Sequence, residues 1–263
     1  MITASETSPE EGTTPRQRSI LKQVREQGFV AIEELARTFD VTPQTVRRDI
    51  NALCSKGVLR RYHGGAGLPS SVENVAYSTR RVLNLKAKQR IAELVAKHIP
   101  NDASLFITLG TTTEEAARAL HRHSGLRVIT NNLQVAAMLS SNASFEVMVA
   151  GGVVRSRDAG ITGEAAIDFF RNFKVDIALM GISSIEMDGT LFDFDFREVR
   201  VLRTIMENAR NTWLMADHSK YGRNALVRVG SISEVDALFT DRRPPEALAR
   251  VLEEADKPVY IAE

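Results

Sequence analysis

The sequence of 263 residues has a single cysteine, Cys54, and lacks any long hydrophobic run. One cysteine cannot form a disulfide within the chain, which fits a protein of the reducing cytoplasm. A membrane-spanning helix needs about 18 or more consecutive apolar residues, so we expect no membrane partner. Residues 1–14 carry acidic side chains and lack the basic and apolar pattern of a secretory signal, and we expect a disordered tail there.

Metal and nucleotide motifs are lacking as well. His and Cys residues show no zinc-ligand spacing. The threonine-rich loop at 110–113 belongs to no G-x-G-x-x-G motif and is followed by no Walker lysine. We therefore expect neither a metal nor a cofactor. The composition, with 43% hydrophobic and 25% charged residues, is that of a soluble globular protein.

Charge is distributed unevenly along the chain. The net charge is only +1, but residues 15–65 contain ten Lys or Arg and five Asp or Glu, so the remainder is acidic. A local excess of positive charge is typical of a surface that meets an anionic partner such as nucleic acid.

The basic region has the pattern of three helices followed by a hairpin. Residues 16–27 and 32–39 carry apolar side chains at helical spacing. A third helix begins where Thr42 suits the N-cap and Pro43 the first helical position. Two helices joined by a tight turn indicate a helix-turn-helix, whose second helix lies in the major groove of DNA.

The start of this third helix and the stretch after it supply groups that suit DNA. Arginine donates bidentately to guanine and also binds phosphate, so outward Arg47 and Arg48 favour an operator contact. The alternative is a solvated helix surface in which Asp49 balances the pair. The stretch GVLRRYHGGAG then has the composition of a basic wing. The expected DNA-binding residues are Thr42, Gln44, Thr45, Arg47, Arg48, Arg60, Arg61, Tyr62 and His63.

From residue 86 onward, helical patterns alternate with short runs rich in Val, Ile and Leu, such as SLFITL at 104–109. This alternation predicts an α/β fold with a parallel sheet and helices on both faces. The polar stretch before it has weak periodicity and is expected to be a linker. The predicted organisation is a tail at 1–14, a winged helix-turn-helix at 15–67, a linker at 68–85 and an α/β domain at 86–263.

Small and polar residues follow several of the predicted strands, at the edge where parallel sheets bind ligands. The loop at 110–113 opens a helix, and free N–H groups with hydroxyls there suit a phosphate. Alternatively, a threonine caps that helix and Glu114 or Glu115 closes a capping box. Gly163 allows close backbone approach or simply starts a helix. Lys220 is either a phosphate contact or an exposed lysine.

Residues 16–66, with TPQTVRRDIN and RRYHGGA, resemble the winged helix-turn-helix of the DeoR family of bacterial repressors. Residues 86–263, with GTTT, TNN, GITGE, DFDFRE and ADHSKYGR, resemble the sensor domain of that family, which is similar in fold to ribose-5-phosphate isomerase. The resemblance implies an operator-binding repressor that senses a phosphorylated sugar or polyol. It implies phosphate contacts from Lys88, Gly110, Thr111, Thr112, Thr113 and Lys220, and polyol contacts from Asn131, Asn132, Asp195 and Glu198.

The same resemblance argues against catalysis. Where the isomerase pattern is V-D-G-A-D-E-I, this chain has LMGISSI at 179–185, and only Glu198 remains of the isomerase's acids. Proton transfer needs a positioned base, so we expect a binding site with no catalytic residue.

The expected mechanism is a homodimer or homotetramer that leaves operator DNA when effector binds. The DNA-reading stretch, rather than any pocket residue, makes sn-glycerol 3-phosphate the first effector to test. Two alternatives stay open: a phosphosugar isomerase with a DNA-binding module, and a constitutive DNA-binding protein whose α/β domain only oligomerises.

Overall fold

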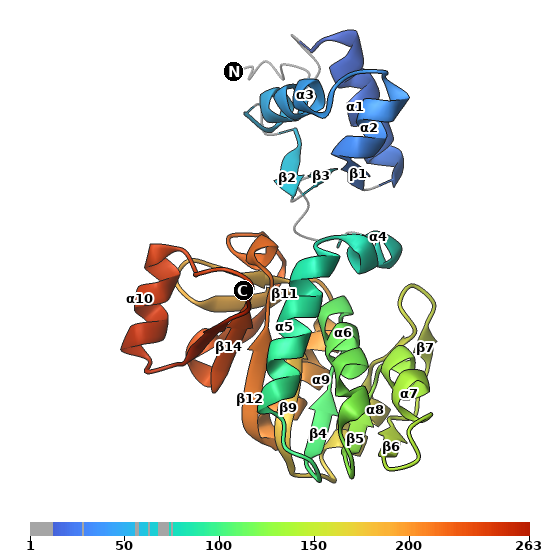
Figure 1. The fold of residues 1–263 in the computed structure, drawn as a ribbon, viewed down its shortest axis with the longest axis vertical. Helices are drawn as coiled ribbons and strands as arrows, with labels where there is room; N and C mark the ends of the chain where they lie inside the picture. Colours follow the sequence, from blue (N-terminus) through green and yellow to red (C-terminus); the bar gives the residue numbers. More distant parts are fainter. Residues whose placement is uncertain (1–12, 28, 56–57, 63, 68–73, 75) are drawn as a thin grey trace, which may run out of the picture. The chain divides into compact units, whose positions relative to one another are not determined.

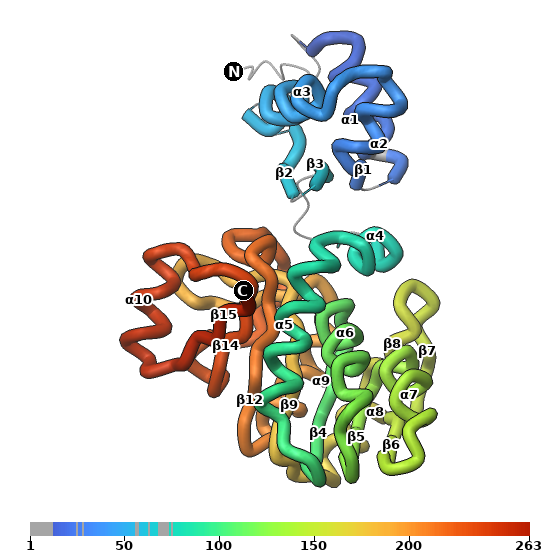
Figure 2. The backbone as a smooth tube through the Cα atoms, viewed as in Figure 1, coloured from blue at the N-terminus to red at the C-terminus, as the bar shows by residue number. Residues whose placement is uncertain are grey.

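The structure is a computed structural model that describes residues 13–27, 29–55, 58–62, 64–67, 74 and 76–263. The chain divides into an N-terminal unit, Met1–Ser70 with Ser78–Leu83, and a C-terminal unit, Ser71–Tyr77 with Asn84–Glu263. Each unit has a hydrophobic core of its own. Figures 1 and 2 show the elements of both.

The N-terminal unit contains the predicted three helices and a small antiparallel sheet of order β1-β3-β2. Its core is built from the apolar stripes of the helices, with Ile20, Leu35 and Val46 almost fully buried. The elements are α1 (Pro15–Gln27), β1 (Phe29–Ala31), α2 (Ile32–Thr38), α3 (Pro43–Ser55), β2 (Arg60–Tyr62) and β3 (Gly65–Gly67).

The C-terminal unit is organised around a parallel sheet of seven strands in the order β15-β14-β12-β9-β4-β5-β6, which confirms the predicted α/β class. Its strands are β4 (Ser104–Ile107), β5 (Arg127–Thr130), β6 (Glu146–Val149), β9 (Val175–Gly181), β12 (Ala209–Met215), β14 (Ala237–Thr240) and β15 (Val259–Ile261).

Helices cover both faces of this sheet (Figure 1). Those of one face, α5, α6 and α7, share a core with Leu105 and Ile107, whereas α8 and α9 share another with Phe106. Alternate side chains of a strand point to opposite faces, so β4 is apolar from Leu105 to Ile107 because both of its faces are buried there. The helices are α5 (Leu85–His98), α6 (Thr111–Ala119), α7 (Leu133–Leu139), α8 (Glu164–Phe170), α9 (Phe196–Glu207) and α10 (Glu246–Glu254).

Several smaller elements were not anticipated from the sequence. The stretch expected to be a linker contains a short helix, α4 (Tyr77–Val82). The others are a hairpin of β7 (Val154–Arg155) and β8 (Gly160–Ile161), and an antiparallel sheet of β10 (Ser184–Ile185), β11 (Thr190–Asp193) and β13 (Val227–Ser231). None of the helices in the described ranges is both long and apolar enough to cross a bilayer.

Candidate functional site

The first turns of α3 present polar and basic side chains to solvent. Thr42 begins the helix as expected, since its Oγ1 accepts a hydrogen bond from the backbone N–H of Thr45 at 3.3 Å. Gln44 and Arg48 are exposed and Arg47 is half-buried. Within the described ranges neither arginine forms an ion pair. Their guanidinium groups therefore keep donors available for an approaching anion.

The carboxylate of Asp49 faces the interior of the unit. Asp49 is 6% exposed and accepts hydrogen bonds from Arg16 Nε at 2.6 Å and Gln17 Nε2 at 3.0 Å. It thereby fastens α3 to α1. The alternative in which Asp49 balances the arginine pair on a solvated surface is wrong, because a helix turns its side chains by about 100° per residue and Asp49 falls on the inner face.

The wing is a tight hairpin between β2 and β3. Arg61 is exposed, with Nη1 donating to Asn51 Oδ1 of α3 at 3.3 Å, and Arg60 is half-buried. Gly65 is required by close packing, because a Cβ there would lie 2.2 Å from the carbonyl oxygen of Val30. Two guanidinium groups are thus carried on a hairpin that is hydrogen-bonded to α3 through Arg61 and Asn51.

The side chain of Tyr62 is buried, unlike that of its neighbour Arg61. It is 8% exposed, and its ring packs edge-on against Phe29 with centroids 6.1 Å apart. Its position favours a structural role in the wing over an operator contact. His63, also expected at the operator, lies outside the described residues.

In the C-terminal unit, the carboxyl ends of β4 and β9 form the topological switch point of the large sheet. The chain runs from β4 outward to β5 and β6, then returns to β9 on the other side of β4. The two ends are in contact, since Gly181 N donates to Thr108 Oγ1 at 3.3 Å. Open α/β sheets bind ligands at such a point.

The loop after β4 leaves the start of α6 uncapped. Gly110 has φ +147°, a conformation that favours glycine, and no side chain caps the helix within the described residues. Thr113 Oγ1 donates to the carbonyls of Thr108 at 2.8 Å and Gly110 at 2.6 Å, so this hydroxyl holds the loop. The first-turn N–H groups thus remain suited to an anion. At the start of α8, Gly163 has φ +107°.

Glu114 does not close a capping box. Its carboxylate is 3% exposed and accepts from the Tyr77 hydroxyl, whose oxygen lies 2.9 Å from each carboxylate oxygen. Asn132 Nδ2 also donates to it at 3.4 Å. The capping-box alternative is wrong, because no side chain caps α6 within the described residues and Glu115 pairs with Arg118 instead.

The two asparagines after β5 are buried and hold the backbone around them. Asn132 caps α7, with Oδ1 accepting from the N–H groups of Gln134 at 3.0 Å and Val135 at 3.4 Å. Asn131 Nδ2 donates to the carbonyl of Ile161 at 2.8 Å. Its buried Oδ1 has no hydrogen-bond partner in the described part of the chain, so only Asn131 retains a side-chain acceptor for a ligand hydroxyl.

Lys88 and Lys220 come together around Asp217. Asp217 is 1% exposed and accepts from Asn84 Nδ2 at 2.8 Å and from the backbone of Ser219 at 3.0 Å. Burial alone raises the pKa of Asp217, but Lys220, the hydrogen bond from Ser219 and Lys88 bring the net pKa below its usual range. Both ammonium groups therefore lie close enough to Asp217 to stabilise its charged form.

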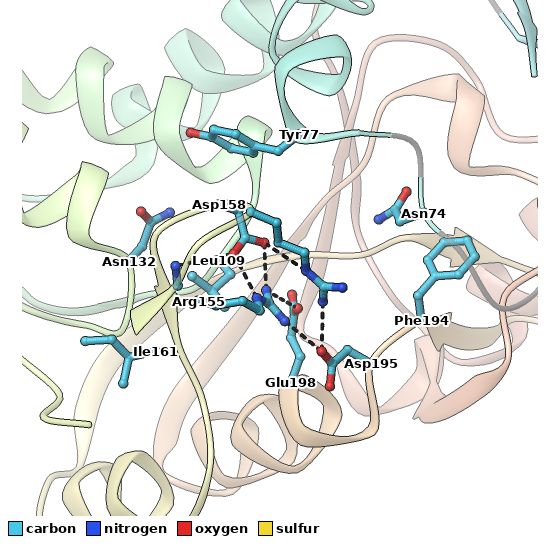
Figure 3. Close-up of polar contacts among 12 residues, drawn as sticks. Asn74, Tyr77, Leu109, Asn132, Arg155, Asp158, Ile161, Phe194, Asp195 and Glu198 are labelled. Carbon is cyan, nitrogen blue, oxygen red and sulfur yellow. Dashed lines mark hydrogen bonds and ion pairs between the residues drawn. The ribbon is translucent and has the colours of Figure 1, made fainter. Parts of the chain in front are cut away.

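A cluster of ion pairs connects the β7–β8 hairpin to the start of α9 (Figure 3). Arg155 binds Asp158 at 2.7 Å, Asp195 at 2.8 Å and Glu198 at 2.8 Å, and Arg157 also binds Asp195 at 2.8 Å. Burial alone lowers the pKa of Arg155, but the carboxylates raise it overall. Both acids expected to accept polyol hydroxyls, Asp195 and Glu198, are thus ion-paired with arginine in this structure.

Comparison with known proteins accounts for both units. The DeoR-like helix-turn-helix domain matches residues 16–72, and the DeoR C terminal sensor domain matches residues 83–242. The chain belongs to the DeoR family. Its similarity to individual members extends along nearly the whole sequence.

Three relatives in this family illustrate the similarity. The glycerol-3-phosphate regulon repressor of Escherichia coli (strain K12) is 49% identical, covering 91% of this chain and 95% of the relative. The repressor of the same name in Haemophilus influenzae is 48% identical over 91% of this chain and 93% of the relative. The HTH-type transcriptional repressor CsqR of Escherichia coli is 46% identical over 94% and 95%.

Solved structures with a related arrangement include ribose 5-phosphate isomerase A of Methanocaldococcus jannaschii, with a TM-score of 0.40 and 14% identity over 53% of this chain and 56% of that one. Another is eIF2B delta of Chaetomium thermophilum, with a TM-score of 0.46 and 13% identity over 63% and 58%.

Some polar residues of this DeoR-family chain escaped the sequence reasoning. Arg155 and Asp158 lie in RSRDAG, where two arginines and an aspartate within four residues, shortly after a glycine pair, were an available signal. Tyr77 and Asn74 lie in the presumed linker, and no local pattern marks them. Arg223 is the last residue of the ADHSKYGR motif and was assigned no role, yet it is 5% exposed.

Proposed function

We propose that this protein is a transcriptional repressor of a glycerol 3-phosphate regulon, which binds operator DNA through its N-terminal unit and leaves it when the C-terminal unit binds sn-glycerol 3-phosphate. Similarity at nearly half of all positions to the repressors named for that regulon supports the choice of regulon. The name of those relatives also makes sn-glycerol 3-phosphate the preferred effector.

The DNA-binding part of the proposal is supported by α3 and the wing. Arg47 and Arg48 extend from the outward face of α3, while Asp49 is turned inward to Arg16 and Gln17. Arginines at the start of a recognition helix reach base edges in the major groove, and basic wing residues bind the flanking phosphates. Recognition of a two-fold operator requires at least two copies, so we propose a homodimer or homotetramer.

One observation above others supports the effector-binding part of the proposal. The uncapped start of α6 lies at the switch point between β4 and β9. Backbone N–H groups at a helix start bind phosphate through hydrogen bonds and the positive end of the helix dipole. Lys88 and Lys220 both act on Asp217, which follows the neighbouring strand β12, and they are the cationic side chains that we assign to the phosphate. The Oδ1 of Asn131 is the acceptor we assign to a polyol hydroxyl.

Release of DNA needs no chemistry in this scheme. An effector that binds more tightly to a conformation incompatible with the operator shifts the population toward it, and operator affinity falls by the ratio of the effector's affinities for the two states. At 179–185 the chain has no acid that would move a proton, so we assign no catalytic step to this site.

The test begins by selecting operator duplexes from random DNA with the full-length protein. Fluorescence anisotropy then gives operator affinity with and without sn-glycerol 3-phosphate, other polyol phosphates and ribose 5-phosphate. Arg47→Ala should lower operator affinity about tenfold or more, because one base or phosphate contact is lost. Lys220→Ala should retain operator binding but need a higher effector concentration for release.

Arg122→Ala is the matched control, since Arg122 is an exposed arginine of the C-terminal unit that follows the C-terminal end of α6, the opposite end of that helix from the proposed phosphate site. It should behave as wild type in both titrations. If no phosphorylated polyol changes operator affinity, and thermal unfolding shows that none of them binds, the constitutive alternative is favoured.

A further inference from the structure

The segment between the wing and α5 is bonded to the C-terminal unit at the carboxyl ends of three strands. The residues that make these bonds, Asn74, Tyr77 and Asn84, belong to that unit. Their partners follow β9, β4 and β12 in turn: Asn74 bonds to Ser183 at 3.3 Å, Tyr77 to Glu114 at 2.9 Å and Asn84 to Asp217 at 2.8 Å. These three residues are therefore bonded to the edge of the sheet at which the effector site is proposed.

The Tyr77 contact is the one nearest the proposed phosphate site in sequence. Glu114 lies four residues after Gly110 and three after Thr111, in the first turn of α6, whose N–H groups are proposed to bind the phosphate. The Tyr77 hydroxyl donates to both oxygens of its carboxylate. A hydrogen bond to a buried charged group is stronger than one between neutral groups.

Asn74 provides a second anchor on the same segment. Its Oδ1 accepts from Arg223 Nη2 at 2.7 Å, and the Arg223 guanidinium lies over the ring of Phe194, 4.8 Å from the centroid. In Figure 3, Asn74 and Phe194 lie to one side of the Arg155 cluster, with Tyr77 above it. The segment is thus fixed to buried groups at more than one point.

We propose that Tyr77, through its hydrogen bond to Glu114, is the positioning residue that transmits effector occupancy to the DNA-binding unit. The proposal rests on the proposed function. A phosphate at the start of α6 brings negative charge close to Glu114 in the first turn of that helix, and like charges repel. A shift of the Glu114 side chain changes its hydrogen bond with Tyr77. Only nine residues lie between Gly67, the end of the wing, and Tyr77, so displacement of Tyr77 changes the positions the DNA-binding unit can reach.

The test measures coupling, the ratio of operator affinity without effector to that with saturating sn-glycerol 3-phosphate. Tyr77→Phe keeps the ring and removes only the hydroxyl. We expect its operator affinity without effector to stay within about threefold of wild type, while the coupling ratio falls about tenfold. Calorimetry should show that the effector still binds, and thermal unfolding that the protein is folded.

Tyr221→Phe is the matched control, because the Tyr221 hydroxyl is also bonded inside this unit, 2.6 Å from Thr240 Oγ1, but lies outside the segment. It should leave the coupling ratio unchanged. Glu114→Gln should reduce coupling, and the double variant with Tyr77→Phe should lose no more than the larger single effect, since both act on one bond. Asn74→Ala should reduce coupling to a smaller extent.

The outcomes separate the two proposals. If wild-type protein fails to respond to any polyol phosphate, the proposed function and this inference both fall. If wild type responds and Tyr77→Phe responds to the same extent, the proposed function stands and the role of Tyr77 is overturned. Equal loss of coupling in Tyr77→Phe and Tyr221→Phe would also overturn it, because a general loosening of the unit would then explain both.

Discussion

The two units use polar side chains in opposite ways. In the N-terminal unit the residues assigned to DNA, such as Gln44 and Arg48, are exposed. In the C-terminal unit many of the residues assigned to the effector are buried, such as Lys88 with 2%, Thr113 with 0% and Asn131 with 2% exposed. A surface that reads a long polymer must present donors outward, whereas a site for a small ligand encloses polar groups whose positions are fixed beforehand. We therefore expect the N-terminal unit to lose function through substitutions at its surface, and the C-terminal unit through substitutions in its interior.

The largest expected effect is on the core of the C-terminal unit. Phe106 is fully buried, and its ring packs edge-on against Phe170 with centroids 5.1 Å apart. Phe106→Ala should lower the free energy of unfolding of this unit by about 3–5 kcal/mol, because it leaves a cavity. Denaturant unfolding should show the N-terminal transition unchanged. An equal shift of both transitions would contradict the independence of the two cores.

Next in size is the ion-pair cluster. Arg155→Met removes the guanidinium from three carboxylates, and we expect a loss of about 3 kcal/mol in the same measurement because those carboxylates remain partly buried. The control is Arg250→Ala, which breaks the exposed pair with Glu246 on α10 and should cost less than about 1 kcal/mol. Similar losses for both variants would show that burial of the cluster has no consequence.

In the N-terminal unit, Arg48→Ala should weaken operator binding without changing the free energy of unfolding. Loss of one guanidinium contact should weaken operator binding by about 1–3 kcal/mol, which is roughly 5- to 150-fold, as measured by anisotropy. Effector affinity and the unfolding transitions should match those of wild type, since Arg48 is exposed. A drop in stability with unchanged operator affinity would place Arg48 in the fold rather than at DNA.

The smallest effect is a pH dependence confined to the C-terminal unit. The pKa of Asp217 is lowered on balance, with burial opposed by Lys220, Ser219 and Lys88. A lowered pKa contributes stability that is fully present above about pH 4, the ordinary value for aspartate, and is lost as the pH falls through the folded-state pKa. Asp217→Asn should flatten the acid limb of this unit's unfolding curve. An unchanged acid limb would mean that Asp217 is not held ionised.

Local pattern was sufficient to predict most elements of both units. The apolar stripes of α1, α2 and α3 and the short apolar runs of the large sheet appear where periodicity predicts them. Gly163 starts α8 and Thr42 starts α3 as their residue types indicate. Such features depend on residues within a few positions of each other, which a sequence shows directly.

Contacts between distant residues could not be predicted in the same way. Arg155 and Asp195 are 40 positions apart, Tyr77 and Glu114 are 37 apart, and Asn84 and Asp217 are 133 apart. They meet because the strand order brings several loops to one edge of the sheet, and periodicity does not determine strand order. The same limit explains why a capping box closed by Glu114 or Glu115, and a surface position for Asp49, stayed open as alternatives in the sequence.

We propose that operator and effector bind to separate units, and that binding of one weakens binding of the other. Linkage is reciprocal, so the factor by which sn-glycerol 3-phosphate weakens operator binding must equal the factor by which operator weakens effector binding. Calorimetric titration of effector into free protein and into the protein–operator complex measures the second factor directly. We predict that effector binds the complex more weakly by the factor seen in anisotropy. Equal effector affinity for free and operator-bound protein would contradict the account.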